Sequence, residues 1–231
     1  MLKEERYDKI LQILEEETYV SSEALALRLF VSMPTIRRDL AHLQKRNLII
    51  RGHGGAKKLN SEHIVTPIDY RKSQNFAQKR AIARKAASLI KDGDIIFIDA
   101  STTALNLADF LDDKMGITVV TNGIPLSIVL SQKGIKSFST GGEIQKSSLG
   151  FAGSLAQNFV RSFNYDICFF SVSALDNAGN VCDTSLEENL VRKAAIESSE
   201  KSVFLCDKSK IGLSAPYNLI KKDEIDYTIT E

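Results

Sequence analysis

The sequence predicts an α/β protein with two domains: a small N-terminal unit of helices and a β-hairpin, and a larger unit built on a parallel sheet. Its 231 residues exceed the size of one small domain, and 43% hydrophobic residues suffice for a substantial core. Residues 1–58 show helical periodicity and then two short β-prone runs, whereas residues 74–231 alternate strand-like and helix-like segments. Apolar periodicity lapses over residues 59–73, where Pro67 stiffens the chain, so we expect a linker there.

Two helices are expected first. Residues 4–16 carry apolar side chains at the i, i+3, i+4, i+7 spacing of one helix face, namely Tyr7, Ile10, Leu11 and Leu14. Ser21 or Ser22 can cap a second helix, because a serine oxygen accepts a hydrogen bond from a free amide of the first turn. That helix is expected to end near Phe30.

A third helix and a hairpin follow. Ser32 offers an N-cap, Pro34 lies in the first turn, and an apolar stripe continues to about Lys45. The β-prone runs LIIR and AKKL are separated by GHGG, whose glycines permit the positive φ of a tight turn. Helix, helix-turn-helix and hairpin together form the layout of a winged helix-turn-helix.

Positive charge is concentrated in this unit. The whole chain is nearly neutral, with 30 basic and 29 acidic residues, which by itself favours neither nucleic acid nor a membrane surface. From Arg28 to Lys58, however, eight basic residues accompany a single acid, Asp39, which we expect to pair with an arginine of the same domain. A solvated face could explain the arginines alone, but the patch coincides with the cap, the turn, the third helix and the hairpin. We therefore predict DNA binding.

The third helix of such a fold reads DNA with residues near its N-terminus. Arginine can bond guanine edges bidentately, and threonine can contact a phosphate or a thymine methyl group. Side chains beside the glycine turn of the wing are placed for phosphate or minor-groove contact, although the histidine there could instead be simply exposed or a pH switch. The predicted DNA-binding residues are Ser32, Thr35, Arg37 and Arg38 on the helix, and Arg51, His53, Gly54 and Lys57 on the wing.

The second domain begins with the helical segment QKRAIARKAASLI. Five apolar runs then alternate with four helix-like segments: DIIFIDA, ITVVTNG, IKSFSTGG, DICFFSVSAL and KSVFLCD. Continuously apolar strands in a βαβα rhythm indicate a parallel sheet covered by helices on both faces. Ligands of such sheets bind at the carboxyl ends of the strands.

Polar residues gather at those strand ends. Hydroxyls before a helix favour a phosphate, amide and carboxylate groups can bond sugar hydroxyls, paired glycines let backbone amides approach, and a lysine adds a mobile charge. Each signal alone is as typical of a helix cap or a turn, but their joint position favours a site for a phosphorylated sugar. The predicted effector-binding residues are Asp99, Ser101, Thr102, Thr103, Thr121, Asn122, Gly141, Gly142 and Lys208.

The run TIRRDLAHLQKRNLIIRGHGGA resembles the signature of the DeoR family of bacterial sugar-metabolism regulators. DGDIIFIDASTT, VVTNG, TGGEI and DKSK resemble landmarks of the family's effector domain, so the resemblance covers nearly the whole chain. It implies a C-terminal domain similar to ribose-5-phosphate isomerase and a repressor of a sugar-catabolic operon, gated by a phosphorylated sugar. It also adds Glu187 or Glu188 to the effector-binding residues.

The sequence departs from the family pattern at four points. Phe30 stands where many members have glycine, and we expect it to pack under the turn. Ser101 stands where glycine is frequent, which implies a tighter phosphate loop, and Arg192 replaces a lysine, which alters charge near the ligand. The chain stops at TITE, so we expect the domain edge to lack the closing helix and strand that many members have.

Other classes of site are disfavoured. Cys168, Cys182 and Cys206 show no CxxC spacing and fit buried free thiols, and the three histidines do not combine with them at a zinc-like spacing. We therefore expect no metal and no cofactor. The charged N-terminus lacks the apolar segment of a signal peptide and no apolar run suits a membrane span, so a cytoplasmic protein is expected.

An enzyme is the alternative function. A sugar-phosphate isomerase needs a base beside a carbonyl group, and residues of suitable type are Asp99, Glu143, Asp183, Glu187 and Lys208. An isomerase needs no basic winged helix, and fold similarity does not carry activity. We therefore favour a regulator that binds operator half-sites as a homodimer or homotetramer, since one small domain makes too few contacts for tight specific binding.

Overall fold

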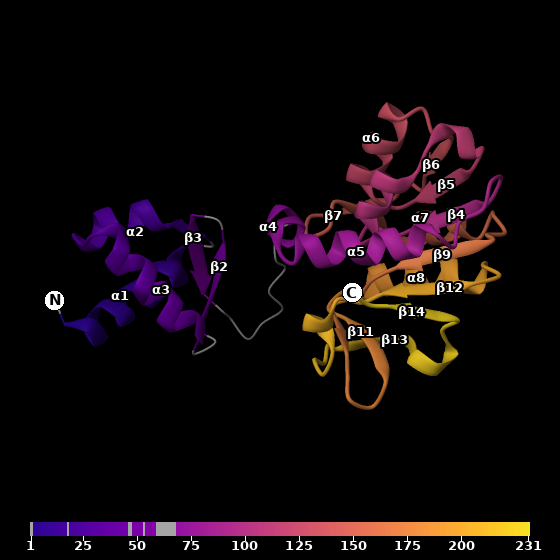
Figure 1. Cartoon of the computed structure of the whole chain (residues 1–231). Coiled ribbons are helices and arrows are strands. Elements are labelled where there is room, and N and C mark those ends of the chain that lie inside the picture. Colours follow the sequence, from indigo (N-terminus) through magenta and orange to yellow (C-terminus); the bar gives the residue numbers. More distant parts are fainter. Residues whose placement is uncertain (1, 18, 46–47, 53, 59–67) are drawn as a thin grey trace. The chain divides into compact units, whose positions relative to one another are not determined.

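The computed structural model describes residues 2–17, 19–45, 48–52, 54–58 and 68–231. The chain divides into two compact units, Met1–Val65 and Thr66–Glu231, each of which has its own core (Figure 1). We call them, after the functions that the sequence predicts for them, the DNA-binding unit and the sensor unit.

The DNA-binding unit packs three helices against a small antiparallel sheet in the strand order β1-β3-β2. Its elements are α1 (Lys3–Glu16), β1 (Val20–Ser21), α2 (Ser22–Leu29), α3 (Met33–Lys45), β2 (Ile49–Gly52) and β3 (Gly55–Lys58). The core takes Ile10 from α1, Leu25 from α2, and Leu40 and Leu43 from α3, all at most 1% exposed. The three helices and the hairpin confirm the predicted winged helix-turn-helix.

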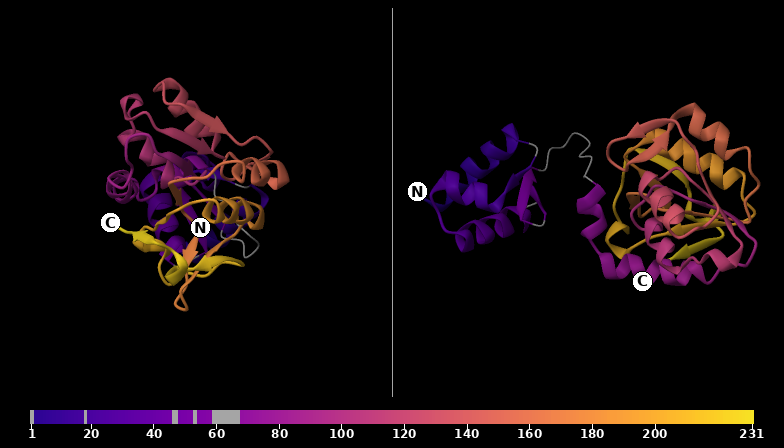
Figure 2. Two further views of the ribbon diagram at one scale, coloured as in Figure 1. Left: turned by 90° about the vertical axis from the view of Figure 1, so that its right-hand side faces the viewer. Right: turned by 90° about the horizontal axis from the view of Figure 1, so that it is seen from above.

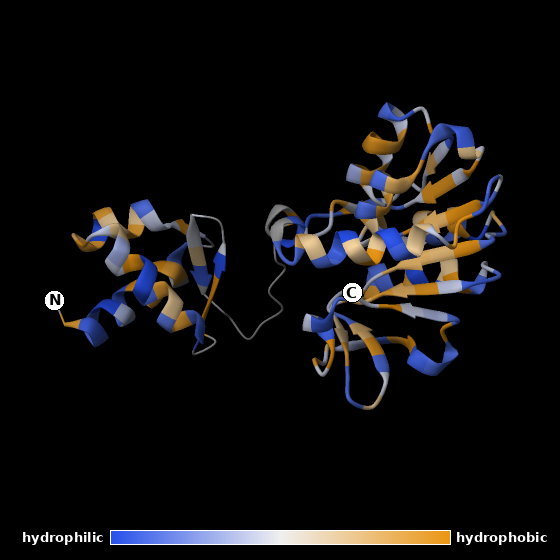
Figure 3. Cartoon of the chain, viewed as in Figure 1, coloured by the Kyte–Doolittle hydropathy of each residue, from blue (hydrophilic) through white to orange (hydrophobic). Residues whose placement is uncertain are grey.

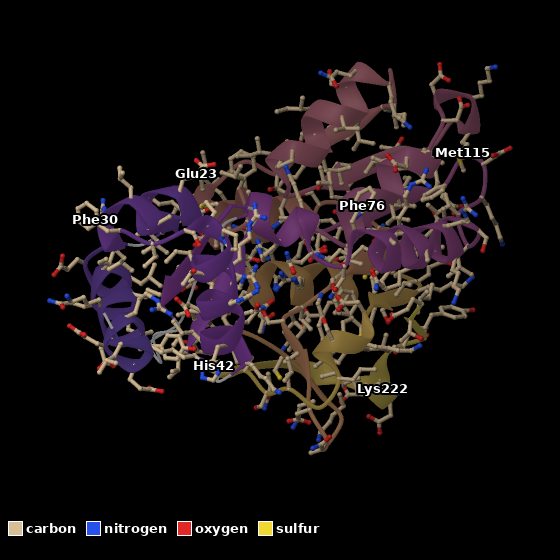
Figure 4. All side chains as sticks on the ribbon, turned by 60° about the vertical axis from the view of Figure 1, so that its left-hand side comes forward. Glu23, Phe30, His42, Phe76, Met115 and Lys222 are labelled. Carbon is tan, nitrogen blue, oxygen red and sulfur yellow. The ribbon has the colours of Figure 1, made fainter. Side chains whose placement is uncertain are left out.

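The turn between α2 and α3 differs from expectation at one residue. Ser21 caps α2 as predicted, with its hydroxyl oxygen 3.1 Å from the amide nitrogen of Ala24. Phe30 ends the helix in the left-handed conformation, with φ of 53°, where a glycine would fit without strain. Its ring is 94% exposed and projects from the turn (Figure 4), so the expectation that it packs beneath the turn is wrong.

The sensor unit is built on a six-stranded sheet in the order β14-β12-β9-β4-β5-β6, with every pair parallel (Figure 1). Figure 2 gives two further views of this unit. Its helices are α4 (Ile68–Ser73), α5 (Phe76–Ala87), η1 (Ala104–Phe110), η2 (Asp113–Met115), α6 (Ile124–Gln132), α7 (Gly153–Val160), α8 (Leu186–Glu197), η3 (Lys208–Lys210) and η4 (Lys222–Glu224). Its strands are β4 (Ile95–Ile98), β5 (Thr118–Thr121), β6 (Ser137–Ser139), β7 (Glu143–Gln145), β8 (Gly150–Ala152), β9 (Ile167–Phe170), β10 (Ala174–Leu175), β11 (Asn180–Asp183), β12 (Ser202–Leu205), β13 (Tyr217–Lys221) and β14 (Tyr227–Ile229).

Alternating side chains of the central strands enter two separate cores, one on each face of the sheet. On β4, Ile96 and Ile98 pack with α5, η1 and α6, whereas Phe97 packs with α7 and α8 on the opposite face. Both faces are therefore covered, as predicted, and the central strands β4 and β9 are hydrophobic along their length (Figure 3).

Several elements were not predicted. Residues 104–110 form a 3₁₀-helix rather than an α-helix, and β7 and β8 make an antiparallel hairpin. A second antiparallel sheet has the order β10-β11-β13. The chain is helical over Ile68–Ser73, inside the predicted linker, while residues 59–67 of that linker lie outside the described residues. Among the described helices, none combines the length and apolar character that a membrane span requires.

Candidate functional site

The outer face of α3 carries the polar residues that the sequence predicted to meet DNA. Ile36, Leu40 and Leu43 fix the helix to the core, which leaves Arg37 and Arg38 exposed on its other side. No carboxylate pairs with either arginine within the described residues. Two unpaired arginines on the second helix of a helix-turn-helix are suited to bonding bases and phosphates.

Ser32 and Thr35 lie at the start of the same helix. Ser32 is exposed and Thr35 half-buried, and their hydroxyl oxygens are 2.9 Å apart. The pair of hydroxyls therefore stands at the end of α3 that is expected to enter the groove.

The one acid of the basic stretch is held away from this face. Asp39 is 2% exposed and accepts two hydrogen bonds from Arg6 of α1, one of them 3.0 Å long. The predicted arginine partner within the domain is thus confirmed, although it comes from α1 rather than from the neighbouring sequence. Arg37 and Arg38 are consequently not neutralised by their sequence neighbour.

The wing matches its prediction only in part. Arg51 is half-buried on β2, and Gly54 is exposed with φ of 85°, as the tight turn requires. His53 lies outside the described residues. Lys57 lies on the middle strand β3 and is only 9% exposed, and burial lowers its pKa, so the structure places it in a buried position rather than on the open wing.

The sensor unit contains a cavity of about 270 Å³ at the carboxyl edge of the large sheet. The loops that follow β4, β9 and β12 form its floor, and α4 and α5 form one wall. Its lining includes Arg71, Asn75, Lys79, Ser101, Thr102, Ser171, Ser173, Asp183, Arg192, Asp207, Ser209 and Lys210. Four cations and two carboxylates thus line one small space.

Arg192 of α8 is the centre of a buried ion-pair network behind this lining. Its guanidinium lies 2.8 Å from Asp99, 2.7 Å from Asp183 and 2.9 Å from Glu188. Burial tends to raise the pKa of Asp183, but the charge of Arg192 and the hydrogen bonds from Ser173 and Thr184 together outweigh burial and hold that pKa below its usual value. The network holds β4, β11 and α8 together, and its three carboxylates share the one guanidinium of Arg192.

A second ion pair lies in the segment that follows β12. Lys210 lies 3.5 Å from Asp207, and it donates a hydrogen bond of 2.8 Å to the hydroxyl of Ser171. The side chain of Asn75 donates to both Asp207 and Ser209. Lys210 therefore also has an acidic partner.

The remaining two cations, Arg71 and Lys79, pair with no carboxylate in the described part of the chain. Lys79 is 5% exposed and donates to the hydroxyl of Thr102, at 3.1 Å, and to the carbonyl of Arg71. Burial, and then the charge of Lys210, lower the pKa of Lys79 to about 8. Arg71 donates to the carbonyl of Ser147, while its buried Nε has no partner among the described residues. Carboxylates act on these two cations only at longer range, Glu188, Asp183 and Asp99 on Arg71 and Asp207 on Lys79, so neither cation forms an ion pair within the described residues.

The structure brings only some of the predicted effector residues to this cavity. Ser101 and Thr102 line it, and Asp99 supports it through Arg192. Glu188, the second member of the predicted glutamate pair, also holds Arg192, whereas Glu187 is exposed on α8.

Other predicted residues lie outside the lining. Thr103 is fully buried, Thr121 accepts a hydrogen bond from the amide of Gly123, and Asn122 donates to the carbonyl of Phe151. Lys208 is exposed, and its backbone amide donates to Glu231.

Gly141 and Gly142 also lie outside the lining. Both have positive φ, 63° and 116°, and they shape the turn between β6 and β7. The glycines therefore serve the backbone of this loop rather than the cavity.

The cations that line the cavity include three that the sequence analysis did not select. Lys210 lies one turn of η3 beyond Asp207, and Arg71 falls in the predicted linker. Lys79 occupies the buried stripe of α5, three residues before Ile82. A lysine at an apolar stripe position was the signal that could have identified it.

Models of two known domains match the chain. The DeoR-like helix-turn-helix domain matches residues 6–62, and the DeoR C terminal sensor domain matches residues 74–231. Among solved structures, a ribose 5-phosphate isomerase from Methanocaldococcus jannaschii is 16% identical with a TM-score of 0.45, covering 60% of this chain and 55% of its own. The sorbitol operon regulator SorC from Klebsiella pneumoniae is 11% identical with a TM-score of 0.46, covering 97% and 94%.

Curated relatives match over the full length. The regulator YulB of Bacillus subtilis is 34% identical over 232 residues, which are 100% of this chain and 90% of YulB. The glycerol-3-phosphate regulon repressor of Escherichia coli is 32% identical over 232 residues, covering 100% and 92%. The repressor GlcR of Bacillus subtilis is 33% identical over 240 residues, covering 100% and 89%. The chain therefore belongs to the DeoR family of helix-turn-helix transcriptional regulators.

Proposed function

We propose that this regulator represses a sugar-catabolic operon and that a phosphorylated sugar, bound in the cavity of the sensor unit, controls it. The observation that carries the proposal is that Arg71 and Lys79 line the cavity beside the hydroxyls of Ser101 and Thr102 without an ion pair among the described residues. Burial disfavours the charged form of both cations, and an anionic ligand in direct contact offsets that cost. A dianionic phosphate suits two such cations.

The phosphate is placed at the Lys79 end of the cavity. The Lys79 ammonium has three N–H donors, of which Arg71 and Thr102 use two, so one remains for a phosphate oxygen. The hydroxyls of Ser101 and Thr102 supply further donors at the same end.

The rest of the cavity suits an uncharged polyol. Asp183 and Asp207 line it, and each is fixed in place by a cation, Arg192 or Lys210. Carboxylate oxygens accept hydrogen bonds from sugar hydroxyls, so these two residues can orient the sugar. The cavity volume of about 270 Å³ limits the ligand to a small metabolite.

The name of one relative agrees with this class of ligand. That relative is a repressor of a glycerol-3-phosphate regulon, and glycerol-3-phosphate is a phosphorylated polyol. The enzyme alternative is not favoured, because the close relatives are transcriptional regulators and the matched N-terminal domain binds DNA. Such a protein acts in the cytoplasm, where the operator lies.

On DNA, α3 enters the major groove and the wing lies against the adjacent backbone. Two or four copies bind repeated half-sites, because one winged helix buries too little surface for tight specific binding. The ligand changes DNA affinity only if it binds the DNA-competent arrangement of the chains and the other arrangement with different affinities.

Thermal-shift measurements on a panel of phosphorylated and free sugars test the ligand class, since a ligand that binds only the folded state raises the unfolding temperature. The wild type should respond to a sugar phosphate and not to the free sugar. Lys79→Met should lose the response, and the matched variant Lys208→Met should keep it, because Lys208 lies outside the cavity. If Lys208→Met lost the thermal response and Lys79→Met kept it, this placement of the phosphate would be disproved.

A further inference from the structure

We propose that Arg71 binds the anion in the cavity and thereby ties ligand occupancy to α4, the helix through which the chain enters the sensor unit. This inference rests on the proposed function for the presence of an anion, but its subject is a different element. Arg71 is the lining residue that lies nearest in the sequence to the DNA-binding unit.

The first observation is how α4 is attached. The guanidinium of Arg71 extends from α4 to the segment between β7 and β8, where its Nη2 donates a hydrogen bond of 2.8 Å to the carbonyl of Ser147. Its other link to the cavity is the hydrogen bond from the Lys79 ammonium to the backbone carbonyl of Arg71. Both the side chain and the backbone of one residue therefore join α4 to the cavity.

The second observation is an unmet donor. The Nε of Arg71 is buried and has no hydrogen-bond partner in the described part of the chain, and burial lowers the pKa of this guanidinium below its usual value. A buried donor that lacks an acceptor costs free energy, and hydrogen bonds to charged groups are among the stronger ones. An anion in the cavity supplies the missing acceptor, so its arrival fixes Arg71 more firmly than the empty cavity does.

The third observation is the shared position of Arg71 and Lys79. The Lys79 ammonium touches both the hydroxyl of Thr102, on the loop after β4, and the carbonyl of Arg71, on α4. An anion held between the two cations thus joins the sheet edge to α4. In the empty cavity the two positive charges repel each other, whereas a bound anion attracts both.

The consequence concerns how the ligand can be sensed. Lys79 lies on α5, which packs against the large sheet, and together with the loop after β4 it supplies affinity. Arg71 supplies a contact with the ligand that can differ between two arrangements of the chain, because it lies on the element that leads to the DNA-binding unit. A ligand can shift an equilibrium only through interactions that differ between the two states, and Arg71 is the cavity residue placed to provide that difference.

Amide hydrogen exchange of the full-length protein tests this role with inorganic phosphate as the probe. Exchange is compared in phosphate and in chloride at equal ionic strength, for the wild type, Arg71→Lys, Lys79→Met and Arg161→Lys. Arg161 is exposed at the end of α7 and serves as the matched control. Arg71→Lys keeps the positive charge and removes the Nε donor and the forked geometry.

In the wild type and in Arg161→Lys, phosphate should slow exchange at least about threefold in two places, the amides of α4 and those of residues 101–106. For Arg71→Lys, the phosphate concentration is raised until residues 101–106 are protected as strongly as in the wild type. At that concentration the amides of α4 should remain unprotected. In Lys79→Met, protection in both places should require more phosphate.

Two outcomes would overturn the proposal, and they differ. The role of Arg71 would be refuted, with the anion site left intact, if phosphate protected residues 101–106 but not α4 in the wild type. The same would follow if phosphate protected α4 in Arg71→Lys as strongly as in the wild type. Absence of protection in both places in the wild type would refute the anion site as well.

Discussion

The charge of Lys79 should make effector binding depend on pH in a range where the ligand itself does not titrate. A sugar phosphate loses its second proton near pH 6, so it is a dianion throughout the range above pH 8. Burial and the charge of Lys210 lower the pKa of Lys79 to about 8. This group is therefore cationic below about pH 8 and neutral above it, and only the cation attracts the phosphate.

The size of the effect follows from the protonated fraction of Lys79. If the protonated form binds and the neutral form does not, the dissociation constant rises about fivefold between pH 8 and pH 9 and about tenfold more by pH 10. Arg71 stays charged over this range, because a guanidinium does not lose its proton there. The bound anion also favours the charged form of Lys79, so binding near pH 9 should take up a proton.

Isothermal titration calorimetry with the sugar phosphate selected by the thermal-shift panel measures both quantities. Titrations in two buffers of different ionisation enthalpy give the number of protons taken up, and the pH series gives the dissociation constant. In Lys79→Met the pH dependence and the proton uptake should both vanish. A dissociation constant that is the same at pH 8 and pH 10, or an equal rise in Lys79→Met, would refute the assignment of the anion to Lys79.

Four further predictions concern stability and DNA binding. Asp39→Asn should destabilise the DNA-binding unit by about 1.5–3 kcal/mol in urea unfolding, because Arg6 loses a charged partner; no change would show that the pair contributes nothing. Arg192→Met should lower the free energy of unfolding of the sensor unit by about 3–5 kcal/mol, because it leaves buried carboxylates unpaired. The difference from the wild type should be smaller when unfolding is measured at lower pH, where carboxylates are protonated. Phe30→Gly should stabilise the DNA-binding unit by about 0.5–1 kcal/mol, since it relieves a left-handed backbone without losing buried surface, and a lower unfolding midpoint would contradict this. Arg37→Ala should weaken operator binding by about 1–3 kcal/mol in fluorescence anisotropy while leaving the effector response intact, and equal losses on random DNA would show a phosphate contact only.

Periodicity and caps predicted most of the fold because they report local physics. Ser21 caps α2 with the expected hydrogen bond, and the stripe of Ile36, Leu40 and Leu43 places α3 where the sequence puts it. The apolar runs became the strands of a parallel sheet with both faces buried. These features depend on residues that lie close together in the sequence, so a single sequence suffices to find them.

The cavity was only half predictable, because its partners come from distant segments. Ser101 and Thr102 follow a strand and could be selected by the rule that ligands bind at strand ends. Arg71 lies on a helix of six residues, too short for a periodic signal, and its role depends on contact with Ser147, far along the chain. Lys57 was selected from the sequence but is buried. A basic residue next to a wing suggests an exposed contact with DNA, but its strand β3 is the middle one of three.

The cations of the cavity also show how one site can be both rigid and responsive. Arg192 and Lys210 are balanced by carboxylates of the protein, and these pairs fix the sheet edge whether or not a ligand is present. Arg71 and Lys79 have no ion-pair partner among the described residues, and carboxylates act on them only at longer range, so the energy of these two cations depends more on what occupies the cavity. If all four cations were in direct ion pairs, an anion would gain little on entering; if none were, their repulsion would weaken the site. Under the proposed function, this division between paired and unpaired cations is what allows a stable sensor unit to respond to an anion.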